Sequence, residues 1–378
     1  MNRVKALSVR YRDVLVGTLA LYKNQFVAFE YDNKWLQSGF SISPFSLPLE
    51  KGVFIPKLDP FDGLFGVFAD SLPDGWGHLL VDRLLTKNKM NPIEANSIDR
   101  LAIVGSMGMG ALTFEPDFKL ESSFESLLDY DQIAIECAKI LRTEYSANLD
   151  ELYILGGSSG GTRPKILTTI EDEDWIIKFP SSYDSIDIGE EEYRYSLCAK
   201  ECGIIMKETK LFPSATCSGY FGTKRFDRII KSPDDTVRIH MLSVSAILET
   251  SHRIPNLDYT TLMRLTLELT KDFSEVEKMY RLMCFNVFAH NRDDHSKNFT
   301  FLYDDEKHSW HLSPAYDLTY SSSIGGEHAT CVNGNGKNPG IDDILEVANH
   351  IGIKEAKAKA LACEIRSIVG KHKLVFNR

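Results

Sequence analysis

The stretch HNRDDHSKN at residues 290–298 is the densest polar cluster of the chain, and the interpretation of the fold starts from it. It follows an amphipathic helical pattern, which we expect to begin at the capping-box pair Ser274 and Glu277. It ends where the strand-like run FTFL begins. The sequence therefore predicts a polar loop that is held between a helix and a strand.

The spacing R-D-x-x-x-x-N, from Asp293 to Asn298, is that of a protein-kinase catalytic loop. There the carboxylate accepts the proton of a substrate hydroxyl, and the amide oxygen is a ligand of magnesium beside the phosphates. Asp317, in SPAYDLTY, follows Asp293 by 24 residues, where a kinase has its second metal-binding carboxylate, although Phe-Gly does not follow it here. An oxygen pair of this kind suits magnesium. A solvated turn and an amide-capping turn aspartate are the plainer alternatives.

Upstream, the segment GGSSGGTRPK at 156–165 is rich in glycine. We predict that 151–170 forms a strand, a glycine loop and a second strand. Glycines lack a Cβ atom, so the backbone amides of such a loop can approach phosphate oxygens. The loop is not a Walker A motif, because no Gly-Lys-Ser/Thr occurs in it. Glycines that simply allow a flexible hairpin are the alternative.

The next predicted strand, 174–180, contains one lysine among apolar residues. Alternation along the strand places Lys178 on the same face as Ile176, and a lysine buried there needs an anionic partner. Phosphate oxygens would serve, with a helix glutamate to orient the ammonium group. Three glutamates open the predicted helix 189–202, and Glu192 is our candidate among them. The alternative is an edge-strand lysine that reaches water.

The order of these motifs is more specific than any of them alone. A glycine loop, a strand lysine, an acidic helix, an R-D-x-x-x-x-N loop and a late aspartate follow one another as they do in a fold that transfers phosphoryl groups. Together they favour this chemistry over a set of unrelated turns.

The fold class is expected to be α+β with two lobes, because a strand-rich half precedes a helix-rich half. A chain of 378 residues also exceeds the roughly 250–300 residues at which a single core stops growing. Residues 1–115 form the first predicted domain, with a hairpin over 14–21 and 25–32. Residues 124–235 are the predicted β-rich nucleotide-binding part, and 236–378 the helical catalytic lobe.

The composition limits the classes of function. The formal charge is −10, from 43 Lys and Arg against 53 Asp and Glu, and no basic block occurs, which argues against direct nucleic-acid binding. No run approaches the ~18–20 apolar residues of a membrane span, and the N-terminus lacks the apolar region of a signal peptide. Seven scattered cysteines without a Cys-x-x-Cys pair fit reduced thiols. We expect a soluble, cytoplasmic protein.

On these motifs the chain resembles the HipA family of serine/threonine kinases, the toxins of HipA/HipB-type bacterial toxin–antitoxin modules. VGTL, FVAFEYD and SLPDGWG resemble the N-subdomain of the family, SSGGTRPK its phosphate loop and WIIKFP its lysine strand. KRFDR at 224–228 resembles the adenine-binding segment, and AHNRDDHSKNF and LSPAYDLTY resemble the catalytic and metal motifs. The resemblance implies a two-lobed, protein-kinase-like fold with ATP and Mg²⁺ as cofactors.

The resemblance also implies a biological role. The chain would phosphorylate a protein hydroxyl and so arrest growth, with an aminoacyl-tRNA synthetase as one candidate substrate. Its partner would be a HipB-like helix-turn-helix antitoxin, and DNA would be reached only through that partner. Ser158 occupies the position of the family's self-inactivating serine, with Ser159 as the alternative. Phosphorylation there would add negative charge to a loop that wraps ATP.

The resemblance assigns individual roles as well. Asp293 would be the catalytic base, and Asn298 and Asp317 would hold magnesium. Lys178 would bind the α- and β-phosphates, with Glu192 as its orienting partner. The other implied cofactor-binding residues are Gly160, Gly161, Thr162, Arg163, Pro164 and Lys165 of the phosphate loop, Lys224, Arg225 and Phe226 of the adenine segment, and His295, Ser296, Lys297 and Tyr316 near the metal motifs.

Two other functions stay open on the sequence. The phosphate loop departs from the family pattern at 162–164, which allows a nucleotide-binding pseudokinase or corepressor that acts by docking to the antitoxin. Alternatively, a metal-dependent phosphohydrolase or nuclease, with no need for Lys178, would use the cluster His290, Asp293, Asp294 and His295.

Overall fold

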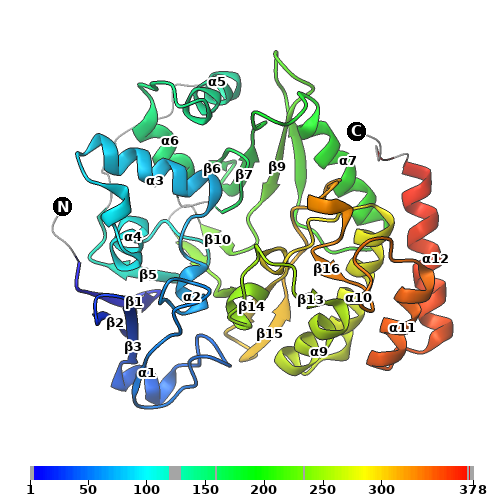
Figure 1. Ribbon diagram of the computed structural model, residues 1–378, viewed down its shortest axis with the longest axis horizontal. Helices are drawn as coiled ribbons and strands as arrows, with labels where there is room; N and C mark the ends of the chain where they lie inside the picture. Colours follow the sequence, from blue (N-terminus) through cyan, green and yellow to red (C-terminus); the bar gives the residue numbers. More distant parts are fainter. Residues whose placement is uncertain (1–3, 119–128, 158–159, 233–234, 373, 375–378) are drawn as a thin grey trace. The chain divides into compact units, whose positions relative to one another are not determined.

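The computed structural model describes residues 4–118, 129–157, 160–232, 235–372 and 374 (Figure 1). The chain divides into two compact units, and each is described by itself. Unit 1 consists of Met1–Gly189, Phe212–Leu242 and Ala246–Thr250, and unit 2 of Glu190–Leu211, Ser243–Ser245 and Ser251–Arg378. The chain thus passes between the units several times, whereas the predicted domains are consecutive along the sequence.

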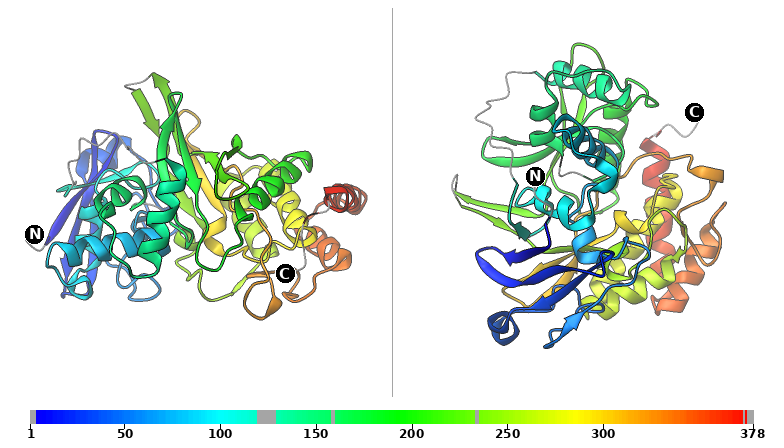
Figure 2. Two further views of the ribbon diagram at one scale, coloured as in Figure 1. Left: turned by 90° about the horizontal axis from the view of Figure 1, so that it is seen from above. Right: turned by 60° about the vertical axis from the view of Figure 1, so that its left-hand side comes forward.

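Unit 1 begins with an antiparallel sheet in the strand order β4-β3-β2-β1-β5. Its first strands are drawn in dark blue in Figure 2. Alternate residues of β1 are buried, as expected for a strand with one face on a core. The hairpin predicted over 14–21 and 25–32 is confirmed as β2 and β3. The strands are β1 (Ala6–Tyr11), β2 (Val14–Tyr22), β3 (Phe26–Tyr31), β4 (Val53–Phe54) and β5 (Leu112–Glu115).

The helices of unit 1 include one at a position where the sequence predicts a strand. Residues 151–155, expected as a strand, belong to helix α6, where Leu152 and Tyr153 are buried in the same core as Trp76 of α3. A short apolar run fits a strand or a helix equally well by periodicity. The helices are α1 (Asn33–Ser38), α2 (Gly66–Ala69), α3 (Gly75–Lys87), α4 (Ser97–Val104), α5 (Tyr130–Leu141) and α6 (Leu149–Gly156), with a 3-10 turn at Pro92–Glu94.

The second sheet of unit 1 contains the predicted lysine strand. Strands β6 (Lys165–Ile170), β7 (Glu173–Lys178) and β9 (Tyr220–Lys224) pair antiparallel in that order. On one face Ile166, Trp175 and Ile177 are buried together with α3 and α6 residues. Lys165 and Lys178 belong to the opposite face, because side chains alternate along a strand. A separate hairpin is formed by β10 (Arg228–Ser232) and β11 (Asp235–Arg238), and the chain crosses between the units at β8 (Thr209–Phe212), β12 (Met241–Ser243) and α8 (Val244–Ile247).

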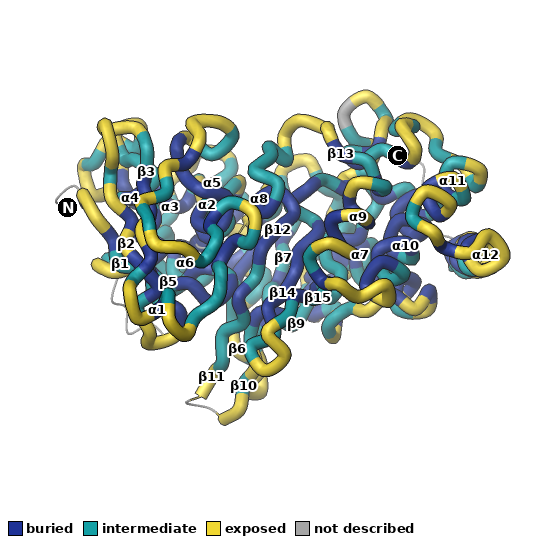
Figure 3. Tube along the Cα trace, turned by 90° about the horizontal axis from the view of Figure 1, so that it is seen from below, coloured by how far each residue is buried: buried dark blue, intermediate teal, exposed yellow. Residues whose placement is uncertain are grey.

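Unit 2 is mainly helical and contains the predicted catalytic loop. Helix α10 is buried along most of its length, while α11 and α12 keep an exposed face (Figure 3). The predicted cap of α10 is wrong: Asp272, not Ser274, caps it, by accepting a bond of 2.8 Å from the Ser274 amide. Its elements are α7 (Ile188–Glu201), β13 (Leu257–Asp258), α9 (Tyr259–Thr270), α10 (Phe273–Phe288), β14 (Thr300–Asp304), β15 (Ser309–Leu312), β16 (Thr330–Cys331), α11 (Ile341–Ile351) and α12 (Glu355–His372), with 3-10 turns at Ser296–Asn298 and Ile324–Gly326.

The fold class is α+β, as predicted from the order of strand-like and helical stretches. The seven cysteines, all in the described part of the chain, form no disulfide with one another. Within the described ranges, none of the helices combines the length and the apolar character that crossing a membrane requires.

Candidate active site

The predicted catalytic loop lies between α10 and β14 of unit 2. The side chain of Asp293 is 63% exposed, so its carboxylate can meet a protein substrate. The Asn298 side-chain amide donates to the backbone carbonyl of Asp293 over 2.7 Å. This bond uses the nitrogen of the amide group and leaves the oxygen of Asn298 as the atom that can bind a cation.

His295 is held in one orientation inside this loop. Its Nδ1 accepts a hydrogen bond of 3.2 Å from the amide of Lys297. A neutral imidazole with an accepting Nδ1 carries its proton on Nε2. That Nε2 lies 3.9 Å from the Asp293 carboxylate, and the His295 ring packs against His252 with the ring centroids 5.4 Å apart. His252 was not expected from the sequence, since it lies far from the loop along the chain.

Asp317 has a left-handed backbone, with a φ of 53°. The residue before it, Tyr316, donates its hydroxyl proton to the carbonyl of Lys297, the residue before Asn298. The same hydroxyl lies 2.6 Å from the hydroxyl of Thr300. Tyr316 thus ties the two predicted metal-binding segments together, although it was expected only as a contact of the cofactor.

Several buried polar atoms of this region have no hydrogen-bond partner within the described residues: Asn291 Oδ1, Arg292 Nε, Ser296 Oγ and Thr319 Oγ1. Buried polar atoms are normally bonded, so unpaired ones indicate a missing ligand or water. The oxygens of Asn298 and Asp317 suit Mg²⁺, which needs few protein ligands when phosphates and water complete its shell. In the described parts of the chain, no group of three or more His, Cys, Asp or Glu side chains is placed to hold a metal ion. By donor chemistry, the oxygens of Asn298 and Asp317 therefore fit a magnesium ion whose shell phosphates and water complete.

The side chain of Asp294 is fully buried, unlike that of its neighbour Asp293. It accepts hydrogen bonds from the Tyr259 hydroxyl at 2.8 Å and from His328 Nδ1 at 2.9 Å. Burial, and then the charge of Asp294, raise the pKa of Tyr259, so the phenol keeps its proton as a donor. Because Asp294 is occupied in this way, it does not join His290, Asp293 and His295 in a metal cluster.

In unit 1 the predicted phosphate-binding lysine lies opposite a second lysine. The register of β6 and β7 pairs Lys178 with Lys165. Like charges directly opposite each other in an antiparallel pair repel, and an anion between them would relieve the repulsion. The Lys178 ammonium also lies 5.6 Å from the ring centroid of Phe221, on the neighbouring strand β9. Cationic and aromatic groups side by side suit a nucleotide.

The glycine loop is held by the segment SLPDGWG, which the sequence did not connect with it. The amide of Gly161 donates to the Asp74 carboxylate, and its carbonyl accepts from the Trp76 amide at 2.9 Å. Gly75 has a φ of 45°, and a Cβ atom there would overlap the carbonyl oxygen of Gly161. The ammonium of Lys165 donates to the carbonyl of Gly160. The predicted Ser158 and Ser159 lie outside the described residues.

Other predicted loop residues are engaged as well. Arg163 makes two bonds of 3.1 Å with the Asp184 carboxylate, and the carbonyl of Pro164 accepts from the Phe179 amide at 2.8 Å. Burial alone would raise the pKa of Asp184, but the Arg163 charge and the bonds from Ser181 outweigh it and lower that pKa. Thr162 completes this part of the loop, between the glycines and Arg163.

The predicted adenine segment is fixed mainly by its own side chains. Arg225 is buried against Asp227 with bonds of 2.9 and 2.8 Å, and its amide donates to the carbonyl of Asp174. The amide of Arg225 is thus already occupied, which limits the predicted adenine contacts to other backbone groups of Lys224 to Phe226. The Lys224 ammonium lies 3.3 Å from the Glu173 carboxylate.

Burial distinguishes Glu192 from its neighbours in helix α7. Its side chain is buried, whereas Glu190 and Glu191 are half-buried. A buried carboxylate needs a compensating partner. The pairing of Glu192 with Lys178 stays a prediction.

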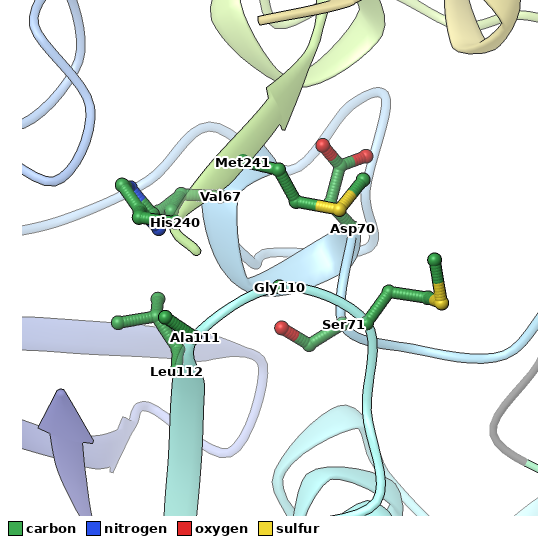
Figure 4. A pocket seen from close by; sticks show the side chains of 9 residues that line it. Val67, Asp70, Ser71, Gly110, Ala111, Leu112, His240 and Met241 are labelled. Atoms are coloured by element: carbon green, nitrogen blue, oxygen red, sulfur yellow. The ribbon is translucent and has the colours of Figure 1, made fainter. Parts of the chain in front are cut away.

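A small cavity of unit 1 is lined by none of the predicted site residues (Figure 4). Its volume is about 10 Å³, which holds one water molecule at most. Its lining residues are Val67, Asp70, Ser71, Met109, Gly110, Ala111, Leu112, His240 and Met241. It is too small to be a nucleotide site.

Comparisons with known proteins show the fold and the family of the chain. A curated relative from Sinorhizobium fredii, Y4dM, is named as a kinase; it is 28% identical over 171 residues, and the match covers 42% of this chain but only 40% of the relative. HipA of Shewanella oneidensis, solved in a complex with HipB and operator DNA, shares the fold with a TM-score of 0.72 at 17% identity, over 98% of this chain and 92% of that one. The family model described as the HipA-like C-terminal domain matches residues 157–372, and the HipA N-terminal domain matches residues 7–115. The chain belongs to the HipA family.

Proposed function

We propose that this chain is a serine/threonine protein kinase of the HipA toxin type, which uses ATP and Mg²⁺. The single observation that carries the proposal is the catalytic loop, where Asp293 is exposed and the Asn298 amide is oriented by the Asp293 carbonyl. Both features are what transfer of a phosphoryl group to a protein hydroxyl requires.

Each residue then has a chemical task. The Asp293 carboxylate accepts the hydroxyl proton of the substrate as that oxygen bonds to the γ-phosphorus and the bond to ADP breaks. Lys178 binds the α- and β-phosphates, and residues 160–165 provide backbone amides and the Lys165 ammonium. Asn298 and Asp317 would hold Mg²⁺, which would neutralise phosphate charge. His295, with its proton on Nε2, donates to the transferring phosphate.

The resemblance to the family supports proposals for the remaining contacts and for the role in the cell. Backbone groups of Lys224 to Phe226 hold the adenine, Glu192 orients Lys178, and Ser296, Lys297 and Tyr316 support the metal side. Ser158 or Ser159 accepts phosphate in self-inactivation. The protein arrests growth through a translation component such as an aminoacyl-tRNA synthetase. A HipB-like antitoxin binds it, as HipB was solved with HipA of Shewanella oneidensis, and an acidic kinase suits a basic partner.

Transfer of label from γ-labelled ATP to the chain itself or to a generic protein acceptor tests the proposal. We expect Asp293→Ala to lower incorporation by about 10²- to 10⁴-fold, the usual contribution of a general base. Asp342→Ala, in the exposed first turn of α11, is the matched control and should keep full incorporation. Equal labelling of wild type and Asp293→Ala would remove the catalytic claim.

A pseudokinase or corepressor is the second candidate, and the glycine loop favours it. The Gly161 amide and the Arg163 guanidinium, which would bind phosphate, are already bonded to Asp74 and Asp184. This candidate predicts that ATP binds without turnover and that the chain associates tightly with a small DNA-binding protein.

A further inference from the structure

The segment that follows Asp317 runs back along the catalytic loop. The amide of Ser321 donates to the carbonyl of His290 at 3.1 Å, and the amide of Ala329 donates to the carbonyl of Arg292 at 3.1 Å. Residues 321–330, which we call the return segment, are therefore bonded to the backbone of the loop at two residues that precede Asp293.

The strongest connection between the two is the side chain of Asp294. Its carboxylate accepts from His328 Nδ1 at 2.9 Å and from the Thr330 amide at 3.2 Å. The Thr330 hydroxyl donates in turn to the backbone carbonyl of Asp294. One loop residue thus receives three hydrogen bonds from two residues of the return segment.

This arrangement is buried, which makes it sensitive to the loss of any member. The side chains of Asp294 and His328 are 0% and 2% exposed. A buried carboxylate is tolerated when donors surround it, and the Tyr259 hydroxyl supplies one more. Tyr259 is held in turn by the Asn286 amide at 2.9 Å. Loss of the carboxylate would leave several buried donors without an acceptor.

The far side of the return segment is also fixed. Thr330 and Cys331 pair in parallel with Leu257 and Asp258, and the Asp258 carboxylate accepts from the Gly334 amide at 2.7 Å. The segment therefore lies between the catalytic loop and β13, within unit 2.

We infer that Asp294, together with His328 and Thr330, is a positioning unit that keeps the return segment in place and fixes the backbone under Asp293. This rests on the proposed kinase function and adds its mode of regulation. Many kinases order the corresponding segment by phosphorylating it, so that the phosphate pairs with arginines. Here a carboxylate of the loop and a histidine of the segment do that work, and the chain needs no phosphate on residues 321–330.

The first test does not depend on activity. Hydrogen exchange is followed at the Ala329 and Thr330 amides in the Asp293→Ala chain after phosphatase treatment. We expect both amides to be protected, and Asp294→Asn in the same background to speed their exchange by about tenfold or more. Asp342→Asn is the matched control, because it makes the same chemical change at an exposed residue in the first turn of α11. Rapid exchange in the dephosphorylated chain, or protection that survives Asp294→Asn, overturns the inference.

The second test measures kinetics in the otherwise wild-type chain. Asp294→Asn should lower kcat by about 10- to 100-fold and leave KM for ATP within about twofold, because the loop loses its position while Lys178 and the glycine loop are unchanged. A change of KM and kcat by equal factors would contradict a positioning role. If Asp294→Asn does not fold, Thr330→Val removes the hydroxyl bond alone. It should lower kcat by a smaller factor and again leave KM for ATP nearly unchanged. If the wild-type chain transfers no phosphoryl group, the proposed function is wrong. The hydrogen-exchange experiment would still show whether Asp294 holds the return segment in place.

Discussion

The two loops assigned to phosphate chemistry are anchored in different ways. In the catalytic loop of unit 2, Asp294 anchors the backbone and its exposed neighbour Asp293 is left for chemistry. In the glycine loop of unit 1, the anchoring groups are the ones that would bind phosphate: the Gly161 amide bonds to Asp74, and Arg163 bonds to Asp184. In the catalytic loop, the anchoring residue Asp294 differs from the proposed catalytic residue Asp293. In the glycine loop, the groups that anchor the loop are also those proposed to bind phosphate.

This difference has a physical consequence for each loop. The catalytic loop can keep all its bonds throughout a reaction cycle. On the proposed function, the glycine loop exchanges carboxylate partners for phosphate partners when a nucleotide binds, and this exchange lowers the net free energy of binding. Changes in the first loop should therefore alter rate, and changes around the second should alter nucleotide affinity.

The largest effect is expected from the metal side of the catalytic loop. Asp317→Ala removes a charged oxygen ligand, and the rate of phosphoryl transfer should fall by about 10²- to 10³-fold or more, as for other groups that stabilise developing charge. Initial rates over a magnesium titration measure it. Asp342→Ala, in the exposed first turn of α11, is the control, and equal rates for both variants would show that Asp317 holds no ion.

The next largest effect is expected at Lys178, which is proposed to bind the nucleotide phosphates. Lys178→Met removes one of the two lysines paired across β6 and β7, so kcat/KM for ATP should fall by about 10- to 100-fold, which corresponds to ~1.4–2.8 kcal/mol. Lys231→Met, on the exposed strand β10, should leave it unchanged. Unaltered ATP affinity and rate in Lys178→Met would place the phosphates elsewhere.

A smaller effect is expected where the glycine loop rests on the N-terminal segment. In Gly75→Ala the new methyl group overlaps the Gly161 carbonyl at a left-handed backbone position, which costs about 1–3 kcal/mol. The melting temperature and the affinity for ATP should both fall. Gly52→Ala meets nothing within 4 Å and is the matched control. A Gly75→Ala protein that binds ATP like the wild type would show that this contact does not shape the loop.

The smallest effect concerns pH. The pKa of Asp184 is lowered in the folded chain, so its ion pair with Arg163 stabilises the fold fully above the unfolded pKa of about 3.9 and is lost as the pH falls through the lower folded pKa. The difference in melting temperature between wild type and Asp184→Asn should be greatest near neutral pH and shrink below about pH 4. A difference that grows on acidification would contradict the assignment.

Local patterns in the sequence were sufficient to predict three structural features correctly. The hairpin of β2 and β3, the alternation around Lys178 and the loop 290–298 depend on neighbouring residues, and all three are present. The start of α6 was missed because a short apolar run has no distinct period.

Contacts between distant residues could not be predicted in this way. His328 lies 34 positions from Asp294, and Asp74 lies 87 positions from Gly161. Neither pair leaves a periodic signal. The adjacent aspartates Asp293 and Asp294 were a hint that Asp294 has a structural role. Two neighbouring side chains of an extended loop point to opposite sides, so only one of them can face a substrate.

The doubled aspartate has a consequence for genetics. If the chain arrests growth as proposed, a screen for cells that survive its overexpression would recover substitutions at both Asp293 and Asp294, and the phenotype would not tell them apart. The first would yield a well-folded protein that still occupies its partners and could act as a dominant competitor. The second would yield one with a loosened segment, prone to proteolytic removal.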